Sequence, residues 1–318
     1  MSRRKILMFL CTLFIIFGGS VLSVRGESLG QPAAKPEVVK VGIYLLRAGS
    51  LDISTGAIDV DFYIDFTCEN LCDKKQDKFE VVNGTLKSAV LLDDADSGHN
   101  PTYRASATVF QDVDLRRYPF DKHQVKIVIE SSNYDESEVA YVVNDQTTAI
   151  DPKVFILGWE VDRAPTAKIV EQHYEAWNLS YTRYEFTANL TKPALAGWLK
   201  GLLPAIFIAL SSLFALFITS KNIGNRVAII TSSLVASVLY HLNFTSRVPS
   251  IGYLTYADTF MMINYVIILI SLALTIWIIR TDSPERQPMV ARVNKVEIIA
   301  IPSLWIVLQI LNALWILR

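Results

Sequence analysis

One apolar segment of the chain contains an unusual number of small and polar side chains. Residues 226–244 read RVAIITSSLVASVLYHLNF, and the polar members within the apolar run are Thr231, Ser232, Ser233, Ser237, His241 and Asn243. Hydroxyl, imidazole and amide groups inside a membrane helix face protein or water, because hydrocarbon offers them no hydrogen-bond partner. These residue types therefore suit the lining of a water-filled path or a tightly packed helix contact.

Helical spacing collects part of this segment on one face. Steps of four, three, four and three residues give the series Ala228, Ser232, Val235, Leu239 and Leu242. The face is small and polar at its first end and apolar further along. A ring of such helices would form a pore with a polar filter beside a hydrophobic gate that dewets. A buried packing helix in a monomeric bundle explains the pattern equally well.

The segment belongs to a strongly apolar second half of the chain. The whole chain is 51% hydrophobic and 19% charged, with a mean hydropathy of +0.31, which argues against an ordinary soluble protein. Runs near the ~20 residues that a membrane-spanning helix needs occupy about 198–218, 227–244, 253–279 and 296–317. We therefore expect a transmembrane domain over residues 196–318 and an exported polar domain over residues 27–195.

The first 26 residues have the pattern of a signal peptide. Arg3, Arg4 and Lys5 form a basic start, an apolar core too short to span a ~30 Å bilayer follows, and small residues lead to Gly26. Cleavage there would export the polar domain, and an uncleaved anchor is the alternative. The connections between the first and second helices and between the third and fourth helices would then lie in the cytoplasm. Both carry basic residues, which agrees with the positive-inside rule, and the C-terminus would lie outside.

The polar half alternates with period two, which predicts half-buried strands. In IDVDFYIDF, residues 58–66, the apolar side chains fall on one face, and HQVKIVIE repeats the pattern. Further strands are expected near residues 38–46, 79–92, 103–111, 138–143, 153–163, 166–174 and 181–191. Many short strands with turn residues between them predict an antiparallel β-sandwich.

The polar half lacks the residue patterns of an enzyme. Its histidines are scattered without metal-ligand spacing, and no nucleophile motif or phosphate-binding glycine loop occurs. No enzyme activity, metal, cofactor or nucleic-acid partner is therefore expected. Cys68 and Cys72 would form a local disulfide in an oxidising compartment, and two free thiols are the alternative.

The stretch QDVDLRRYPFDKHQV, residues 111–125, is expected to form a loop whose apolar tip is flanked on both sides by charged residues. Together and in order, LRRYPFD, GWE at 158–160, LLP at 202–204 and RVPSIGYLTYAD at 247–258 resemble the pentameric ligand-gated ion channels, the Cys-loop receptor superfamily. The short connection between the last two helices is similar to the prokaryotic branch. So is the absence of the cysteine pair at Gln111 and Val125.

The resemblance implies a homopentamer of identical subunits with the second helix lining a central pore. It places the tip Tyr118, Pro119 and Phe120 against the membrane domain near Pro249. It also implies that Asp121 pairs with Lys192 and that Asp52 is the second acid, whereas solvation near headgroups would be the plainer role of these charges. Breaking a partly buried pair leaves a charge unpaired, so such a pair can couple the two domains.

The resemblance also suggests two further sites. Aromatic residues of the last hairpin, Tyr174, Trp177 and Tyr181, with Tyr134 facing them, could hold a cationic amine or pack between subunits. The family's Trp-x-Pro element is missing, since no Trp occurs between residues 41 and 158. The cytoplasmic mouth, Gly224, Asn225 and Arg226, carries no acid, which predicts weak cation selectivity or anion preference.

The resulting hypothesis is an agonist-gated channel subunit of a bacterial inner membrane, with its N-terminal domain and C-terminus in the periplasm. Its partners would be identical subunits, the lipid bilayer, a small-molecule agonist or protons, and permeating ions. A non-conducting membrane receptor that signals through a partner protein is the alternative. A membrane-embedded enzyme is disfavoured, because Asp258 is the only acid between residues 197 and 280.

Overall fold

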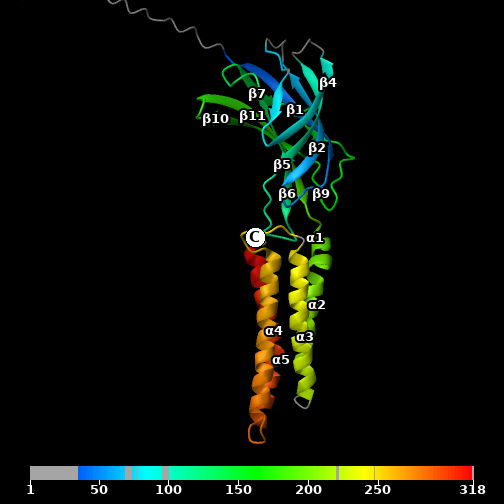
Figure 1. The fold of residues 1–318 in the computed structure, drawn as a ribbon, viewed down its shortest axis with the longest axis vertical. Coiled ribbons are helices and arrows are strands. Elements are labelled where there is room, and N and C mark those ends of the chain that lie inside the picture. Colours follow the sequence, from blue (N-terminus) through cyan, green and yellow to red (C-terminus); the bar gives the residue numbers. More distant parts are fainter. Residues whose placement is uncertain are drawn as a thin grey trace, which may run out of the picture. The chain divides into compact units, whose positions relative to one another are not determined.

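The computed structural model describes residues 35–316 apart from 69–73, 77, 95–99, 220–221 and 247. The expected signal peptide, residues 1–26, and Cys72 lie outside the described residues. Within the compact unit of Lys35–Arg318, strands come first and helices follow (Figure 1). The predicted fold class, an N-terminal β-sandwich followed by four helices able to span a membrane, is confirmed.

The described strands form two sheets. The first has the order β4-β5-β2-β1-β7, with β8 also on β1, and the second has the order β10-β11-β6-β3, with β9 also on β11. The bounds in the first sheet are β1 Glu37–Ala48, β2 Ala57–Thr67, β4 Gly84–Asp94, β5 Pro101–Phe110, β7 Val139–Val143 and β8 Ala149–Ile150. Those in the second are β3 Phe79–Val81, β6 Lys122–Ser131, β9 Glu160–Val161, β10 Thr166–Tyr174 and β11 Leu179–Thr191.

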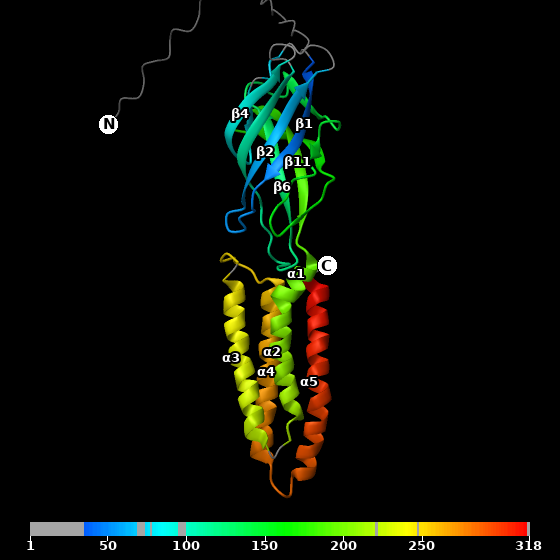
Figure 2. The same cartoon turned by 90° about the vertical axis from the view of Figure 1, so that its right-hand side faces the viewer.

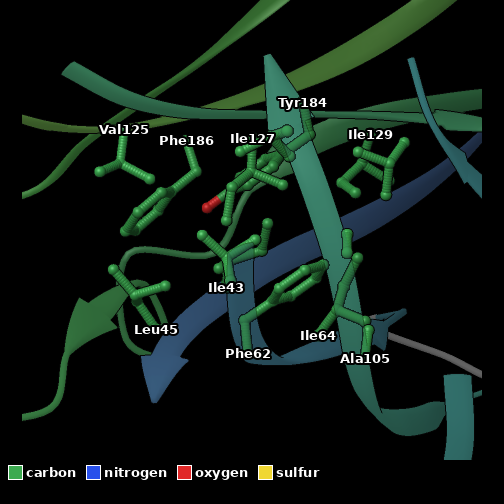
Figure 3. Close-up of a cluster of buried hydrophobic side chains, with 14 of the residues drawn as sticks. Ile43, Leu45, Phe62, Ile64, Ala105, Val125, Ile127, Ile129, Tyr184 and Phe186 are labelled. Carbon is green, nitrogen blue, oxygen red and sulfur yellow. The ribbon is translucent and has the colours of Figure 1, made fainter. Parts of the chain in front are cut away.

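Side chains from both sheets meet in one core, part of which Figure 3 displays. Alternate residues of β2 point inward, so that Phe62 and Ile64 are fully buried beside Ile43 of β1. From the other sheet, Ile127 of β6 and Phe186 of β11 are also fully buried. Each such side chain contributes roughly 1.5–3 kcal/mol through removal from water, so the alternation read in the sequence is what holds the sheets together.

Two predicted strands differ from the structure. The segment predicted at 79–92 is divided by a turn at Val82 and Asn83 into β3 and β4, which belong to different sheets. The segment predicted at 153–163 is mostly irregular, because the positive φ of Gly158, +85°, bends the chain. Ile156 and Trp159 form an isolated bridge across this bend, and only the two residues of β9 pair with another strand. The segment's apolar residues Val154 and Ile156 still pack into the core, which explains their strand-like spacing.

The membrane half contains four candidate spans in the described residues, Ala194–Phe217, Ile223–Thr245, Tyr256–Thr281 and Gln287–Ile316. The first consists of α1 Ala194–Ala196, the π-helical turn η1 Gly197–Leu202, α2 Leu203–Phe214 and the 3₁₀ turn η2 Ala215–Phe217. The others are single helices, α3, α4 and α5 in that order. Figure 2 shows α2, α3, α4 and α5 running alongside one another, and α4 packs on both α3 and α5.

Gly56 is a position where the turn before β2 requires glycine. Its φ is +72°, and a Cβ there would lie 2.1 Å from the carbonyl oxygen of Gln111. Gly56→Ala should destabilise the protein by at least the roughly 1–2 kcal/mol of a left-handed residue, since the clash adds to the backbone strain. The change should appear as a lower melting temperature of the detergent-solubilised protein.

Gly49→Ala is the matched control for this substitution. A Cβ at Gly49 would meet its nearest atom, the carbonyl oxygen of Asp59, at an ordinary 3.5 Å. A similar loss of stability in both variants would contradict the geometric account of Gly56.

Candidate functional site

Helix α3 has two different faces. The residues predicted to line a pore, Ala228, Ser232, Val235, Leu239 and Leu242, are all exposed in the single chain. The buried side carries Arg226, Ile230, Ser233, Ser237 and Phe244. The predicted face therefore exists as one continuous exposed stripe, and its role as a pore lining stays a prediction.

The exposed stripe of α3 differs in composition from that of α5. It includes Ser232 and Asn225 together with Leu239, which is 62% exposed. The exposed residues of α5 in the middle of its span are almost all large and aliphatic, and Val307, Ile310 and Leu311 are examples. Water or another protein surface suits the first stripe, because it exposes hydroxyl and amide groups together with apolar side chains. Lipid suits the second, where Ser303 is exposed among large aliphatic side chains.

Arg226, the third residue of the predicted mouth, does not lie on the exposed stripe. Its residue is 1% exposed, and its Nη2 donates to Glu297 Oε1 of α5 at 2.6 Å. Its Nη1 donates to Asn294 Oδ1 at 2.8 Å. Of the three predicted mouth residues, only Gly224 and Asn225 are exposed.

A polar network joins α3 to α4 nearer the other end of α3. His241 Nε2 lies 3.0 Å from Asp258 Oδ1, and His241 Nδ1 lies 2.9 Å from the hydroxyl of Tyr265. Asp258 also closes a capping box with Thr255 at the start of α4. Sequence reasoning noted His241 and Asp258 one at a time and missed that they meet.

The apolar tip of the charged loop contacts three helices. The ring of Tyr118 lies 5.3 Å from that of Phe244 in α3, and the ring of Phe120 lies 5.8 Å from that of Tyr256 in α4. Pro119 sits over the π-helical turn η1, where a Cβ on Gly201 would come within 3.0 Å of Pro119 Cγ. The small residues of η1 are therefore what allow the tip to approach so closely.

Backbone hydrogen bonds fix the same loop to the start of α4. The amide of Tyr256 donates to the carbonyl of Arg116 at 2.8 Å, and the amide of Ala257 donates to the carbonyl of Tyr118 at 3.2 Å. Pro249, predicted to lie near the tip, lines with Tyr118 a cavity of about 500 Å³. The predicted tip residues are thus brought together with the membrane half.

Asp121 lies behind the tip and is shared by two bases. Its Oδ2 is 3.6 Å from Lys192 Nζ and 3.1 Å from His123 Nε2, and its side chain is fully buried. Burial raises the pKa of Asp121, but the hydrogen bond with His123 and the charge of Lys192 outweigh it, so the pKa is lowered overall. The structure thus places the predicted partners next to each other and adds His123, which sequence reasoning had treated as a solvated or hydrogen-bonding residue.

Aromatic rings surround the ammonium of Lys192. It lies 4.6 Å from the ring centroid of Tyr118 and 5.2 Å from that of Trp159. The ring of Trp159 also meets that of His123 edge-on at 5.0 Å. Trp159 of the GWE motif therefore packs against both bases of the Asp121 cluster, and this packing is the structural role of the motif.

Asp52, expected to be the second acid, bonds within its own turn, and its role in coupling stays a prediction. Its Oδ1 accepts from the amide and the hydroxyl of Ser54, at 2.8 Å and 2.6 Å, and its Oδ2 accepts from the hydroxyl of Thr55 at 2.8 Å. These hydrogen bonds, led by the one from the Ser54 hydroxyl, lower the pKa of Asp52. The carboxylate stabilises its own turn.

The predicted aromatic site is partly assembled on the hairpin of β10 and β11. The ring of Tyr174 lies 5.8 Å from that of Trp177 and 5.7 Å from that of Tyr181, both edge-on, and Trp177 is 70% exposed. Tyr134, expected to face them, instead packs against the sandwich core beneath the ammonium of Lys74. Three of the four predicted ligand residues therefore form one cluster.

An internal cation already lies against this cluster. The guanidinium of Arg183 is 5.5 Å from the ring centroid of Tyr174, and its Nε donates to buried Glu130 at 2.7 Å. Glu80 is the cross-strand partner of Glu130. Burial and the charge of Glu130 raise the pKa of Glu80.

Cys68 is disulfide-bonded in the structure. Because Cys72 lies outside the described residues, the pairing of Cys68 with Cys72 stays a prediction. Cys68 also packs against the sandwich core, at the end of β2. No group of three or more His, Cys, Asp or Glu side chains in the described part of the chain could hold a metal ion.

No protein-family model matches the chain. Over 322 residues the chain is 21% identical to a proton-gated ion channel of Gloeobacter violaceus, covering 91% of this chain and 87% of that relative. It is 27% identical to an acetylcholine-gated chloride channel subunit of Caenorhabditis elegans and 23% identical to a gamma-aminobutyric acid receptor subunit of Gallus gallus. These two matches cover 54% and 53% of this chain but only 36% and 34% of the relatives.

Lys192→Met should lower the stability of the protein by roughly 1–3 kcal/mol, since it removes a charged partner from a buried carboxylate while keeping an apolar side chain. The pKa of Asp121 is lowered, so its contribution is present above its unfolded pKa and lost as the pH falls through the folded value. The loss of stability should therefore be full at neutral pH and shrink below about pH 4.

Lys122→Met, at an exposed lysine beside the same loop, is the control and should leave the melting temperature unchanged. Melting curves of both variants from pH 3 to pH 7 would check this. A pH-independent effect of Lys192→Met would mean that packing, and not the ion pair, is what the lysine provides.

Proposed function

We propose that this chain, a relative of the pentameric ligand-gated ion channels, is a subunit of an agonist-gated ion channel that assembles as a homopentamer. The observation that carries the proposal is the exposed stripe of α3, polar at one end and apolar further along. A helix in a monomeric bundle would bury its serine hydroxyls, as α3 buries Ser233 and Ser237. This helix leaves Ser232 exposed together with Val235 and Leu239, and a water-filled axis between subunits gives that face a partner.

The pore itself would have a polar and an apolar part. Ser232, about two turns from Asn225 of the mouth, offers hydroxyls to permeating ions. Val235, Leu239 and Leu242, which are 58%, 62% and 64% exposed, would form the gate. Rings of such side chains expel water from a narrow pore and block ions without touching them.

Coupling between the sandwich and the pore would pass through the charged loop. Its tip touches Phe244 of the pore helix, and its carbonyls hold the start of α4. Lys192 follows β11 and precedes α1, so the Asp121 pair joins the loop to the chain as it enters the membrane half. A movement of β11 would therefore displace the loop tip that contacts Phe244.

The agonist would bind in the sandwich. A relative from Gloeobacter violaceus is named as proton-gated and one from Caenorhabditis elegans as acetylcholine-gated, so protons and a cationic amine are the two ligand classes to test. The aromatic hairpin of Tyr174, Trp177 and Tyr181 is the candidate site for an amine. Glu80, whose pKa is raised, is the candidate proton acceptor beside it.

We place the channel in a bacterial inner membrane, with the sandwich and the C-terminus in the periplasm. Two basic residues, Arg280 in the last turn of α4 and Arg286 in the connection to α5, support this orientation through the positive-inside rule.

A non-conducting receptor that signals through a partner protein is the competing function. Purified protein would be counted for subunits by mass measurement of the detergent complex and reconstituted in liposomes for current recording over a range of pH and with small amines. Pentamers with agonist-dependent current are the expected result. Pentamers that stay silent under every condition would favour the receptor.

Val235→Ser should make opening easier, because a hydroxyl at the proposed gate lets water remain in the pore. The expected result is leak current or a response at roughly tenfold lower agonist concentration, recorded in the same liposomes. Val307→Ser introduces the same change on the exposed face of α5, where the valine is 51% exposed, and should leave gating unchanged. Equal effects of the two substitutions would remove Val235 from the gate.

A further inference from the structure

We infer that Glu297 of α5 is a positioning residue for ion selection, because it holds Arg226 on the buried face of α3 and neutralises its charge. The inference rests on the proposed channel function and names a determinant outside the pore helix. Without Glu297, an uncompensated cation would lie directly after Asn225, which is an exposed residue of the mouth.

Arg226 and Glu297 form a buried, charged hydrogen bond between α3 and α5. Arg226 is 1% exposed and Glu297 is 3% exposed, and the charged hydrogen bond between them measures 2.6 Å. Asn294 lies three residues before Glu297 on the same face of α5 and accepts from the second terminal nitrogen of Arg226. The guanidinium is thus held by two acceptors from one helix.

The contact is also incomplete, which makes it sensitive to the loss of Glu297. Arg226 Nε and Glu297 Oε2 are both buried without a hydrogen-bond partner among the described residues. The pair is therefore joined through one terminal nitrogen and one carboxylate oxygen, not through a two-bond fork. Asn294 alone is neutral and cannot balance the guanidinium.

The net charge of the Arg226–Glu297 pair sets the electrostatic potential at the mouth of the proposed pore. With Glu297 ionised, the pair is neutral, and the mouth presents only Gly224 and Asn225. Without it, each subunit gains one positive charge beside the mouth. Burial weakens the screening of that charge, so it would act across the thickness of one helix. A side chain as long as arginine could also turn toward the water of the mouth.

Reversal potentials in a sodium chloride gradient test the inference. Glu297→Gln should raise the chloride-to-sodium permeability ratio by roughly threefold or more, because a positive ring attracts anions. Arg226→Gln should shift the ratio the opposite way. The double variant should return close to the unmodified channel. Glu285→Gln removes an acid from the exposed connection before α5 and should change nothing.

The reference for a shift in the other direction is Asn225→Glu, which adds an acid on the exposed face itself and should favour sodium. A conducting Glu297→Gln channel with an unmodified permeability ratio would overturn the inference while leaving the proposed function intact. A silent unmodified protein would overturn the proposed function, and the permeation part of this inference with it.

Thermal unfolding of the same variants tests the contact independently of current. If Glu297 holds Arg226, the double variant should lose less melting temperature than the sum of the two single losses, because either single substitution already breaks the pair. Strictly additive shifts would overturn the contact. If Glu297→Gln fails to assemble, Asn294→Asp gives the answer, because a second carboxylate on Arg226 should shift permeation toward sodium.

Discussion

The start of α4 imposes the constraint on which the rest of the molecule depends. A helix leaves its first N–H groups without intrahelical acceptors, and inside a protein each must find one elsewhere. Here the amides of Tyr256 and Ala257 donate to carbonyls of the charged loop, and the amide of Asp258 donates to the hydroxyl of Thr255. The loop therefore cannot leave α4 without exposing buried donors. This requirement, more than the apolar tip, ties the sandwich to the membrane half.

The same helix start is connected to α3. Asp258 accepts from the amide of Thr255 through one carboxylate oxygen and lies 3.0 Å from His241 of α3 through the other. A displacement of the loop would move the cap, and a displacement of the cap would move His241. Ring contacts run in parallel from Tyr118 to Phe244. Two physically different connections thus reach α3 within one turn of each other, one polar and one apolar.

The sequence predicted most reliably what depends on local periodicity. Alternation placed Ile58 to Phe66 on the core face of β2, and helical steps found the exposed stripe of α3. The same helical geometry explains why Arg226 is buried. Arg226 precedes Ala228 by two residues, so its side chain is rotated by about 200° from the exposed stripe. What periodicity could not supply was the partner, since Glu297 lies 71 residues away.

Other differences between the predictions and the structure have similar causes. The start of α5 was predicted at residue 296, yet the helix begins at Gln287, because its first turns are polar and an apolar run cannot reveal them. The role of Asp52 as a second acid comes from the family's pattern and stays a prediction, whereas its own neighbours explain the turn that the structure shows. Ser54 and Thr55 follow it directly, and hydroxyls two and three residues after an aspartate favour a local turn.

The polar contacts of α3 are concentrated near its ends. Arg226 bonds to α5 at one end, and His241 bonds to α4 near the other. Between them the buried face carries Ser233 and Ser237. Ser233 makes one long contact of 3.4 Å to Ser211, and the Ser237 hydroxyl has no partner among the described residues. Small side chains with weak polar contacts give a helix little resistance to bending or rotation against its neighbours. That section lies directly behind Val235 and Leu239, so the part of α3 that the fold restrains least is the part where a gate would have to move.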